Sequence, residues 1–411
     1  MKNRRPELLI PASSLEVLKT AVIFGADAVY IGGEAFGLRA KAKNFSMEDI
    51  REGIEFAHEH GVRVHVTVNI LAHNDDLEGV EEYLRELKEI GPDALIIADP
   101  AIFEMAKEIC PEIERHISTQ ANNTNYGTYR FWWKQGAKRV VSARELSLKE
   151  IKEIRERIPE EMEIESFIHG AMCISYSGRC LLSNYFTGRD ANQGACTHPC
   201  RWKYAVVEET RPGEYMPVYE NERGTYIFNS KDLCMIEHIP EMIDAGIDSF
   251  KIEGRMKTAL YVATVARTYR KAIDDYLEDP EKYKANMPWY LDQISNCTYR
   301  QFTTGFYFGK PSEESQIYDS NTYVKEYTYL GIIGGEKDGM YRIEQRNKFS
   351  VGETIEIMKP DGRNIEVTVR RIVDEDGTEQ ESAPHPKQVL YIDFGEEAEQ
   401  YDILRRAEPE T

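Results

Sequence analysis

Four cysteines gather in one short stretch, residues 165–202, which reads ESFIHGAMCISYSGRCLLSNYFTGRDANQGACTHPCRW. They are Cys173, Cys180, Cys196 and Cys200, and the whole chain has seven cysteines. Their spacing is Cys-x6-Cys, then fifteen residues, then Cys-x3-Cys. Thiolates on a short, glycine-bearing, irregular segment are the soft ligands that iron–sulfur clusters and zinc select. The stretch therefore predicts a metal site.

The spacing also bears on which metal is bound. Structural zinc sites usually contain Cys-x2-Cys pairs, and neither pair here has that spacing, which favours a 4Fe-4S cluster over zinc. Zinc stays the alternative metal. A third interpretation is that the four cysteines are buried, unligated small hydrophobic residues, although their Gly, Arg and Asn neighbours fit that poorly.

The other cysteines are weaker candidates. Cys234 follows in SKDLCMIEHIP and is a substitute for the fourth ligand, but a cysteine at the start of an amphipathic helix more often serves packing. Cys110 and Cys297 lie far from the cluster in the sequence, so we expect both to be inert.

The cysteine stretch resembles a known family signature. The resemblance extends to ELLIPA at 7–12, GADAVYIGG at 25–33 and SFKIEGRMK at 249–257, and so covers nearly the whole chain. Within the stretch it rests on Glu165, Phe167, Gly170, Ala171, Met172, Cys173, Gly178, Cys180 and Ser183. The chain is identified as a member of the collagenase-like peptidase family U32, of unassigned catalytic type, and is most similar to its tRNA hydroxylation branch.

The resemblance implies a function and a cofactor. The tRNA hydroxylation branch is implicated in prephenate-dependent formation of 5-hydroxyuridine at the tRNA wobble position. Family relatives in ubiquinone hydroxylation carry a 4Fe-4S cluster. The implied co-substrate is therefore prephenate, and the implied partner is tRNA, with a second protein of the same family as a further candidate partner.

Length and composition are typical of a globular protein with two domains. The chain has 411 residues, of which 41% are hydrophobic and 10% aromatic, enough for a packed core. No run of apolar residues is long enough to span a membrane, and the start lacks a signal-peptide hydrophobic region. We expect a cytoplasmic protein without a membrane partner, where clustered cysteines favour metal chemistry over disulfides.

The charge balance limits how RNA could bind. Lys and Arg number 51 against 71 Asp and Glu, a net charge of −20, which opposes non-specific binding to a polyanion. A tRNA would need a local basic patch. Two candidate patches are Arg39, Lys41 and Lys43, and Arg179, Arg189, Arg201 and Lys203.

The first two thirds of the chain alternate between short apolar runs and capped amphipathic helices. The predicted strands are 8–11, 28–31, 63–70, 94–98, 116–120, 139–142, 163–168 and 249–253. Eight such units predict an α/β fold, a (β/α)8 TIM-like barrel over 1–285 that includes a Cys-rich insertion, 165–235, after the seventh strand. An open doubly wound sheet is the alternative.

Barrel enzymes place function at the carboxyl ends of their strands. Here nearly all of those ends are polar or glycine: Pro11, Gly32, Gly33, Asn69, Asp99, Gln120, Arg144, His169, Gly170 and 253–255. The Cys-rich segment follows the seventh strand, so we expect it to lie at the same mouth.

After a connection at 286–322 the hydrophobic period changes to two. Six short strands are predicted, which indicate a small C-terminal β-barrel domain over 323–411. They are 327–333, 340–345, 354–358, 365–371, 389–394 and 403–406. The resemblance implies that this is the family's C-terminal domain. A hairpin is predicted between Lys203 and Lys231, beside the cysteine segment.

Three residues are candidates for catalysis. Arg255 and Lys257, in a loop before a helix, are placed to bind an anion such as a dicarboxylate, although a salt bridge from Arg255 to Glu253 explains it equally well. His169, at a strand end, suits proton transfer or a structural hydrogen bond.

Three functions stay open: an iron–sulfur tRNA hydroxylation enzyme, a peptidase, and a zinc-stapled RNA-binding scaffold. The sequence has neither His-Glu-x-x-His nor Gly-x-Ser-x-Gly, and its cysteines cluster like ligands, which disfavours the peptidase.

Overall fold

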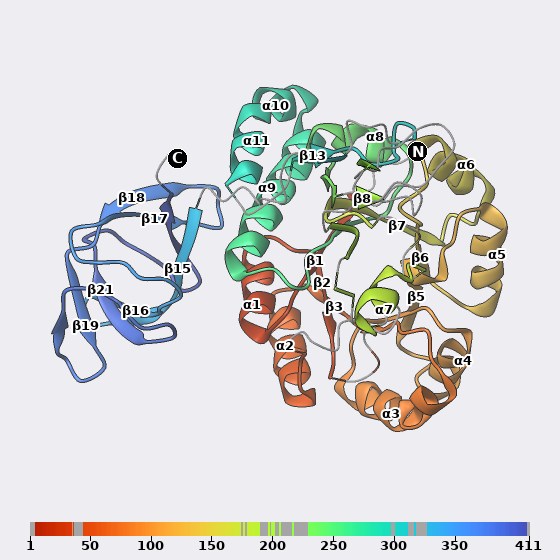
Figure 1. Cartoon of the computed structure of the whole chain (residues 1–411), viewed down its shortest axis with the longest axis horizontal. Coiled ribbons are helices and arrows are strands. Elements are labelled where there is room, and N and C mark those ends of the chain that lie inside the picture. Colours follow the sequence, from red (N-terminus) through yellow and green to blue (C-terminus); the bar gives the residue numbers. More distant parts are fainter. Residues whose placement is uncertain are drawn as a thin grey trace. The chain divides into compact units, whose positions relative to one another are not determined.

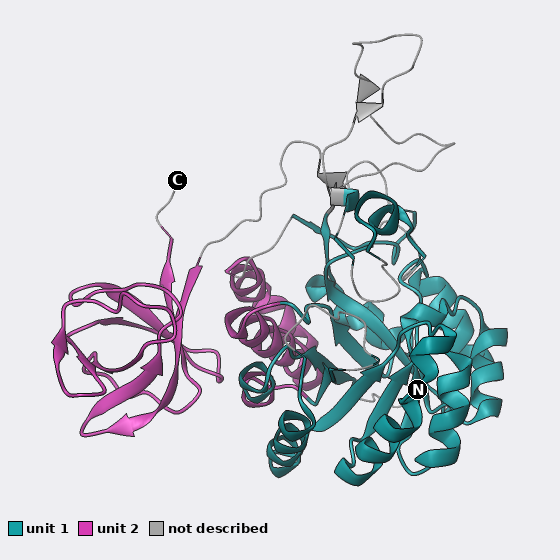
Figure 2. Ribbon diagram, turned by 60° about the horizontal axis from the view of Figure 1, so that its bottom comes forward, with its two compact units in different colours: residues 1–19, 27–256, 300–322 teal, residues 20–26, 257–299, 323–411 magenta. Residues whose placement is uncertain are grey.

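The structure is a computed structural model. It describes residues 5–34, 36, 44–173, 176, 179–189, 196–197, 199–201, 205–206, 216–217, 229–296, 301–310, 316–317 and 327–408. The chain divides into two compact units (Figure 2). One comprises residues 1–19, 27–256 and 300–322, and the other comprises residues 20–26, 257–299 and 323–411.

Within the described residues, eight parallel strands of the first unit close into a barrel, because the eighth strand pairs with both the first and the seventh. This confirms the predicted (β/α)8 class over the open sheet. The barrel strands are β1 (Glu7–Pro11), β2 (Ala28–Gly32), β3 (Arg63–Val68), β4 (Ala94–Ile97), β5 (Glu114–Ile117), β6 (Arg139–Val141), β7 (Glu163–Gly170) and β12 (Ser249–Ile252).

Helices alternate with these strands and most of them lie outside the barrel in Figure 1, whereas α7, in the cysteine segment, is drawn over the middle of the barrel. They are α1 (Leu15–Ile23), α2 (Met47–Glu59), α3 (Val80–Ile90), α4 (Pro100–Ile109), α5 (Tyr126–Gln135), α6 (Leu148–Arg157), α7 (Leu182–Thr187) and α8 (Ile239–Asp244). The predicted caps are present: Ser46 accepts from the Asp49 amide and Asp49 accepts from the Ser46 amide, a capping box at the start of α2. No helix in the described part of the chain is both long and apolar enough to cross a membrane.

Short strands follow the cysteine segment. β8 (Ala205–Val206) pairs with β9 (Met216–Pro217) as an antiparallel hairpin, as predicted for this region. β10 (Asn229–Ser230) pairs with β14 (Gln316–Ile317). β11 (Asp232–Cys234) runs antiparallel to β7 and parallel to β13 (Phe302–Thr303).

The second unit contains three helices and a curved antiparallel sheet, a half-barrel. The helices are α9 (Ala259–Glu278), α10 (Pro280–Ala285) and α11 (Met287–Ser295). In the residues described, the sheet has the order β18-β17-β22-β15-β16-β21-β19-β20. Its strands are β15 (Tyr327–Lys337), β16 (Met340–Glu344), β17 (Thr354–Met358), β18 (Asn364–Thr368), β19 (Arg371–Asp374), β20 (Glu379–Gln380), β21 (Val389–Asp393) and β22 (Ile403–Ala407).

Alternating residues such as Ile355 and Ile357 fill the core of this sheet, which confirms the predicted period of two. The predicted strand 365–371 was wrong, because it is two strands: β18 pairs with β17, whereas β19 pairs with β21. Between these two strands the Val369 amide donates to the Glu353 carbonyl (2.9 Å) and the Arg370 amide donates to the Asp393 carbonyl (2.7 Å), so the chain changes its partner strand there. The boundaries 1–285, 286–322 and 323–411 stay predictions, since compactness groups 257–299 with the C-terminal sheet.

Three barrel strands differ from their predicted bounds by two residues or more, and the other five differ by one residue. β3 ends at Val68 rather than at residue 70. β5 ends at Ile117 rather than residue 120, because the Ser118 hydroxyl accepts from the Gln120 amide and starts a 3-10 turn, Thr119–Ala121. β7 continues to Gly170 rather than ending at 168, because β11 adds backbone pairing at its end.

A cluster of buried charges fills the amino-terminal end of the barrel. The Arg139 guanidinium donates to Glu7 (2.5 Å), Glu163 (2.6 Å) and Glu165 (3.0 Å), so β6 is bonded to β1 and β7. Burial by itself disfavours the charged form of Glu7, but Arg139 outweighs this and holds the pKa of that carboxyl far below its usual value. The barrel is therefore closed by ion pairs as well as by its ladder of hydrogen bonds.

Arg139→Ala should destabilise the protein by about 3–5 kcal/mol, because it leaves buried carboxylates without their cation. The matched control is Arg157→Ala: Arg157 pairs with Glu153 on the surface, both side chains about half exposed, and should contribute at most about 1 kcal/mol. Urea unfolding of both variants measures the difference. Equal, small losses would contradict the structural role of Arg139.

Candidate active site

Arg144 organises the carboxyl end of the barrel. It lies just beyond β6, and its guanidinium donates to the Ala171 carbonyl (3.1 Å) and pairs with Glu253 (3.3 Å), beyond β7 and β12. The central carbon of this guanidinium, Cζ, lies 4.0 Å from the ring centre of Phe167, and Arg144 Nη1 lies 4.0 Å from Cys173 Sγ. Arg144 therefore connects the barrel mouth to the cysteine segment.

His169 and Cys234 lie opposite one another on paired strands. Their Cα atoms are register partners between β7 and β11, and the His169 carbonyl accepts from the Glu253 amide (2.8 Å). The interpretation of Cys234 as a packing residue at a helix start was wrong in its local structure, because the segment pairs with the extension of β7. This pairing brings Cys234 to the strand end from which the cysteine segment leaves.

Gly170 is required where β7 ends. It has φ +106°, and a Cβ there would lie 2.5 Å from the Glu253 carbonyl oxygen. A side chain would therefore combine an unfavourable backbone conformation with a backbone overlap. This close approach is what holds the end of β7 against the end of β12.

Arg255 points into the barrel. It is buried, donates to the Thr67 hydroxyl (3.1 Å), and occupies the space that a Cβ on Gly32 would need. Burial raises the pKa of Tyr83, and the positive charge of Arg255 partly offsets that shift. Glu253 has an ion pair with Arg144. The alternative role of Arg255, a salt bridge to Glu253, stays a prediction.

Lys257 belongs to the second compact unit. Its ammonium lies 4.7 Å from the ring centre of Tyr261, a cation–π contact within that unit. His169 is buried, with its ring centre 5.7 Å from that of Phe302. The roles predicted for Lys257 and His169 stay predictions.

The predicted thiol ligands form no disulfides in the part of the chain that the structure describes. Cys173 and Cys196 are exposed, whereas Cys180, Cys200 and Cys234 are half-buried. The Ser183 hydroxyl accepts from the Thr197 amide (3.0 Å), which fastens α7 to the residue after Cys196. This hydrogen bond joins the residues that follow Cys180 to the residue that follows Cys196. The ligand set itself stays a prediction.

Cys110 differs from these thiols. It is buried, its Sγ donates to the Ala106 carbonyl (3.2 Å), and burial raises the pKa of the thiol to about 11. A thiol held protonated is a poor ligand and nucleophile, which agrees with the expectation that it is inert. Cys297 lies outside the described residues.

Of the two predicted basic patches, the first lies wholly outside the described residues and the second is partly described. Arg39, Lys41, Lys43 and Lys203 lie outside the described residues, as does the side chain of Arg201. Arg189 is exposed, and Arg179 is exposed and donates to Asn122 (2.8 Å). Nearby in the sequence are apolar side chains that are also exposed: Tyr176, Leu181, Tyr185 and Phe186.

A group that the sequence did not single out lies inside the barrel. Among the described residues, His65, His116 and Glu165 form the one group of three candidate ligands whose ligand atoms all lie within 4.8 Å of one another. Two histidines at the third position of short strands (RVHVTV and ERHI) were the available signal. Their closeness depends on barrel closure, so sequence spacing did not reveal it.

A closed α/β barrel with a cysteine-bearing segment at its mouth and a separate β domain defines the class of this protein. Peptidase family U32 matches residues 13–317, and the C-terminal domain of peptidase family U32 matches residues 325–405. The chain belongs to peptidase family U32, which confirms the resemblance that the sequence motifs indicated.

Relatives match the chain over most of its length. "tRNA hydroxylation protein P1" of Bacillus subtilis (strain 168) is 43% identical over 406 residues, 98% of this chain and 95% of that protein. "tRNA hydroxylation protein P" of Escherichia coli (strain K12) is 38% identical over 444 residues, 98% of this chain and 97% of that protein. "23S rRNA 5-hydroxycytidine C2501 synthase" of Escherichia coli (strain K12) is 39% identical over 279 residues, 68% of this chain and 41% of that protein.

Gly170→Ala tests the close approach of β7 and β12. We expect it to cost roughly 3 kcal/mol, the upper end of what a strained backbone conformation costs, because overlap with Glu253 adds to the unfavourable φ. Gly188→Ala is the matched control: Gly188 also has positive φ (+64°), but a Cβ there would meet nothing within 4 Å, and the substitution should cost about 1–2 kcal/mol. Urea unfolding compares them, and equal losses would show that the overlap is relieved without cost.

Proposed function

We propose that this protein is an RNA-hydroxylating enzyme that acts on tRNA and forms 5-hydroxyuridine at the wobble position in a prephenate-dependent reaction. The observation that carries the proposal is the match of 98% of the chain to proteins named tRNA hydroxylation proteins. The relative named as a 23S rRNA 5-hydroxycytidine synthase supports hydroxylation of an RNA base more generally. A second protein of the same family is a candidate partner in the reaction.

The surface near the cysteine segment supports contact with RNA. Tyr185 is 80% exposed, and Tyr176 and Phe186 are exposed as well. Proteins that bind single-stranded RNA stack bases on such rings and neutralise phosphates with arginine, which Arg179 and Arg189 would supply. A local patch is required because the chain as a whole carries a net charge of −20.

The cysteines suit a 4Fe-4S cluster. Cys173, Cys180, Cys196 and Cys200 would hold it, with Cys234 as the substitute for the fourth, and the cluster would supply electron transfer when bound. Two structural observations support this: disulfides do not occupy these described thiols, and Arg144 Nη1 lies 4.0 Å from Cys173 Sγ, which ties the first of these thiols to the end of the barrel. Zinc at the same residues is the alternative and would make the segment a structural staple for RNA binding.

Arg255 is the residue we propose for the co-substrate. A buried guanidinium at the barrel mouth, oriented by Thr67, suits a bidentate grip on a carboxylate of prephenate. Arg255 is buried, and burial strengthens the attraction to a carboxylate because it removes competing water.

Peptidase activity is the second candidate, and the family description favours it. Digestion of denatured collagen by the purified protein tests it directly. The colour of anaerobically purified protein adds a second test, because a brown, iron-containing protein supports the cluster and colourless protein with stoichiometric zinc supports the scaffold.

Arg255→Ala should abolish wobble-uridine hydroxylation, because loss of a desolvated guanidinium costs about 2–5 kcal/mol of binding to a carboxylate. The variant should keep its iron and fold. Mass spectrometry of tRNA nucleosides from cells that carry the variant as their sole copy measures 5-hydroxyuridine. Normal 5-hydroxyuridine levels in the variant would show that Arg255 does not bind the co-substrate.

The matched control for this experiment is Arg155→Ala. Arg155 pairs with Asp248 (3.0 Å) at the opposite end of the strands, so its loss should lower the melting temperature without lowering 5-hydroxyuridine in cells where the protein still accumulates. If both variants lower hydroxylation in proportion to their loss of stability, Arg255 has a structural role only.

Replacing any one of Cys173, Cys180, Cys196 and Cys200 by alanine should abolish iron retention, because each supplies one ligand. Cys110→Ala and Cys297→Ala should keep full iron. Iron analysis after anaerobic purification measures this. Full iron in one of the first four variants removes that residue from the ligand set, and iron loss in Cys234→Ala with retention in Cys200→Ala would make Cys234 the fourth ligand.

A further inference from the structure

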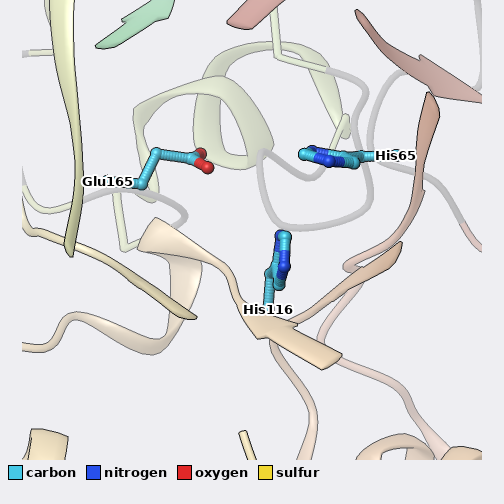
Figure 3. Close-up of side chains that lie close together, drawn as sticks. All are labelled: His65, His116 and Glu165. Atoms are coloured by element: carbon cyan, nitrogen blue, oxygen red, sulfur yellow. The ribbon is translucent and has the colours of Figure 1, made fainter. Parts of the chain in front are cut away.

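Three buried side chains converge inside the barrel, away from the cysteine segment. His65 on β3, His116 on β5 and Glu165 on β7 each occupy the third position of their strand and point toward one another (Figure 3). None of the three is exposed to solvent, and their candidate ligand atoms lie within 4.8 Å of one another. Alternate strands contribute one interior layer of a barrel, so the barrel geometry itself assembles this group.

His116 is held as a metal-binding histidine usually is. Its Nε2 lies 3.1 Å from a carboxylate oxygen of Glu114, and its Nδ1 is buried without a partner among the described residues. An ionised carboxylate accepts only, so Nε2 carries the hydrogen and the Nδ1 lone pair is free. Metal-ligating histidines characteristically donate their other ring hydrogen to a carboxylate or carbonyl.

His65 has more unpartnered ring nitrogens than His116. Both of its ring nitrogens are buried and have no partner in the described part of the chain. Buried polar atoms are nearly always hydrogen-bonded, or bound to water or an ion. The ring stands edge-on to His116, with centroids 4.8 Å apart and planes at 86°.

Glu165 supplies the negative charge. Lys251 donates to one of its oxygens (2.6 Å) and Arg139 to the other (3.0 Å), and these two hydrogen bonds fix the orientation of the carboxylate. Each oxygen has a second lone pair. A carboxylate positioned by outer partners is the usual arrangement around a metal ion.

We propose that His65, His116 and Glu165 bind one divalent transition-metal ion inside the barrel. Two imidazoles and one carboxylate are a ligand set suited to ions such as Zn²⁺ and Fe²⁺. This site is separate from the cysteines, which lie beyond the end of β7 and offer sulfur rather than nitrogen and oxygen. The ligands are fully buried, so the ion should exchange slowly once the barrel has folded.

Cobalt is a suitable probe because its spectrum distinguishes nitrogen and oxygen ligands from thiolates. The full chain with Cys173, Cys180, Cys196, Cys200 and Cys234 replaced by serine is stripped of metal in denaturant and refolded with Co²⁺. We expect one equivalent of bound Co²⁺, with visible ligand-field bands but no sulfur charge-transfer band, and a higher melting temperature than without metal, because binding favours the native state. No bound Co²⁺ in the folded protein would overturn the proposal.

The double variant His65→Leu, His116→Leu identifies the ligands. Apolar residues of similar volume should be tolerated in a buried site, while the affinity for Co²⁺ should fall by more than the roughly 10–100-fold that loss of an outer partner costs. The matched control is His58→Leu: His58 also pairs with a carboxylate, Asp93 (2.9 Å), but on the surface, and should keep the affinity unchanged. Unchanged affinity in the double variant would overturn the proposal.

If the double variant does not fold, pulsed EPR of the Cu²⁺-loaded parent chain decides. Couplings from two imidazole nitrogens at the bound ion support the site. A bound ion without these nitrogen couplings, or no bound ion, overturns the proposal. The histidines would then contact an ordered water or have a packing role only.

Discussion

One buried guanidinium, Arg139, holds the barrel together at its amino-terminal end. It joins β6 to β1 and β7 through Glu7, Glu163 and Glu165, and Lys251 on β12 then pairs with Glu165. These ion pairs cross the seam where β12 closes the barrel between β1 and β7. A desolvated charge tolerates no missing partner, so the interior of this barrel is specified by charge complementarity as well as by hydrophobic packing.

The ion cluster leaves the opposite end of the barrel free for function. At the carboxyl end of the barrel Arg144 has a role similar to that of Arg139 at the amino-terminal end. Its guanidinium connects the ends of β6, β7 and β12. Arg255 lies within the barrel rather than on its rim. The cysteine segment leaves from the same strand ends. Arginines that contact residues of other strands thus lie at both candidate sites: the half-buried Arg144 beside Cys173 and the buried Arg255 beside Thr67.

Much of this organisation was predictable from the sequence. The eight barrel strands follow from short apolar runs between capped helices, and family U32 follows from the motif around Cys173 and from SFKIEGRMK at 249–257. Some errors had a local cause, such as the turn at Ser118 that ends β5, but others lay where a strand's extent depends on a partner distant in sequence. β7 continues to Gly170 and Cys234 lies on a strand because β11 pairs there. Local periodicity contains no information about such pairing.

By itself the sequence determined the elements, the cysteine spacing and the charge balance, because these depend on neighbouring residues. Only the tertiary structure decided which distant residues meet. Arg255 reaches Thr67 across 188 residues of sequence, and His65, His116 and Glu165 converge although they lie on three different strands. Such contacts depend on closure, strand register and the inward alternation of side chains, which are properties of the assembled barrel rather than of any one segment.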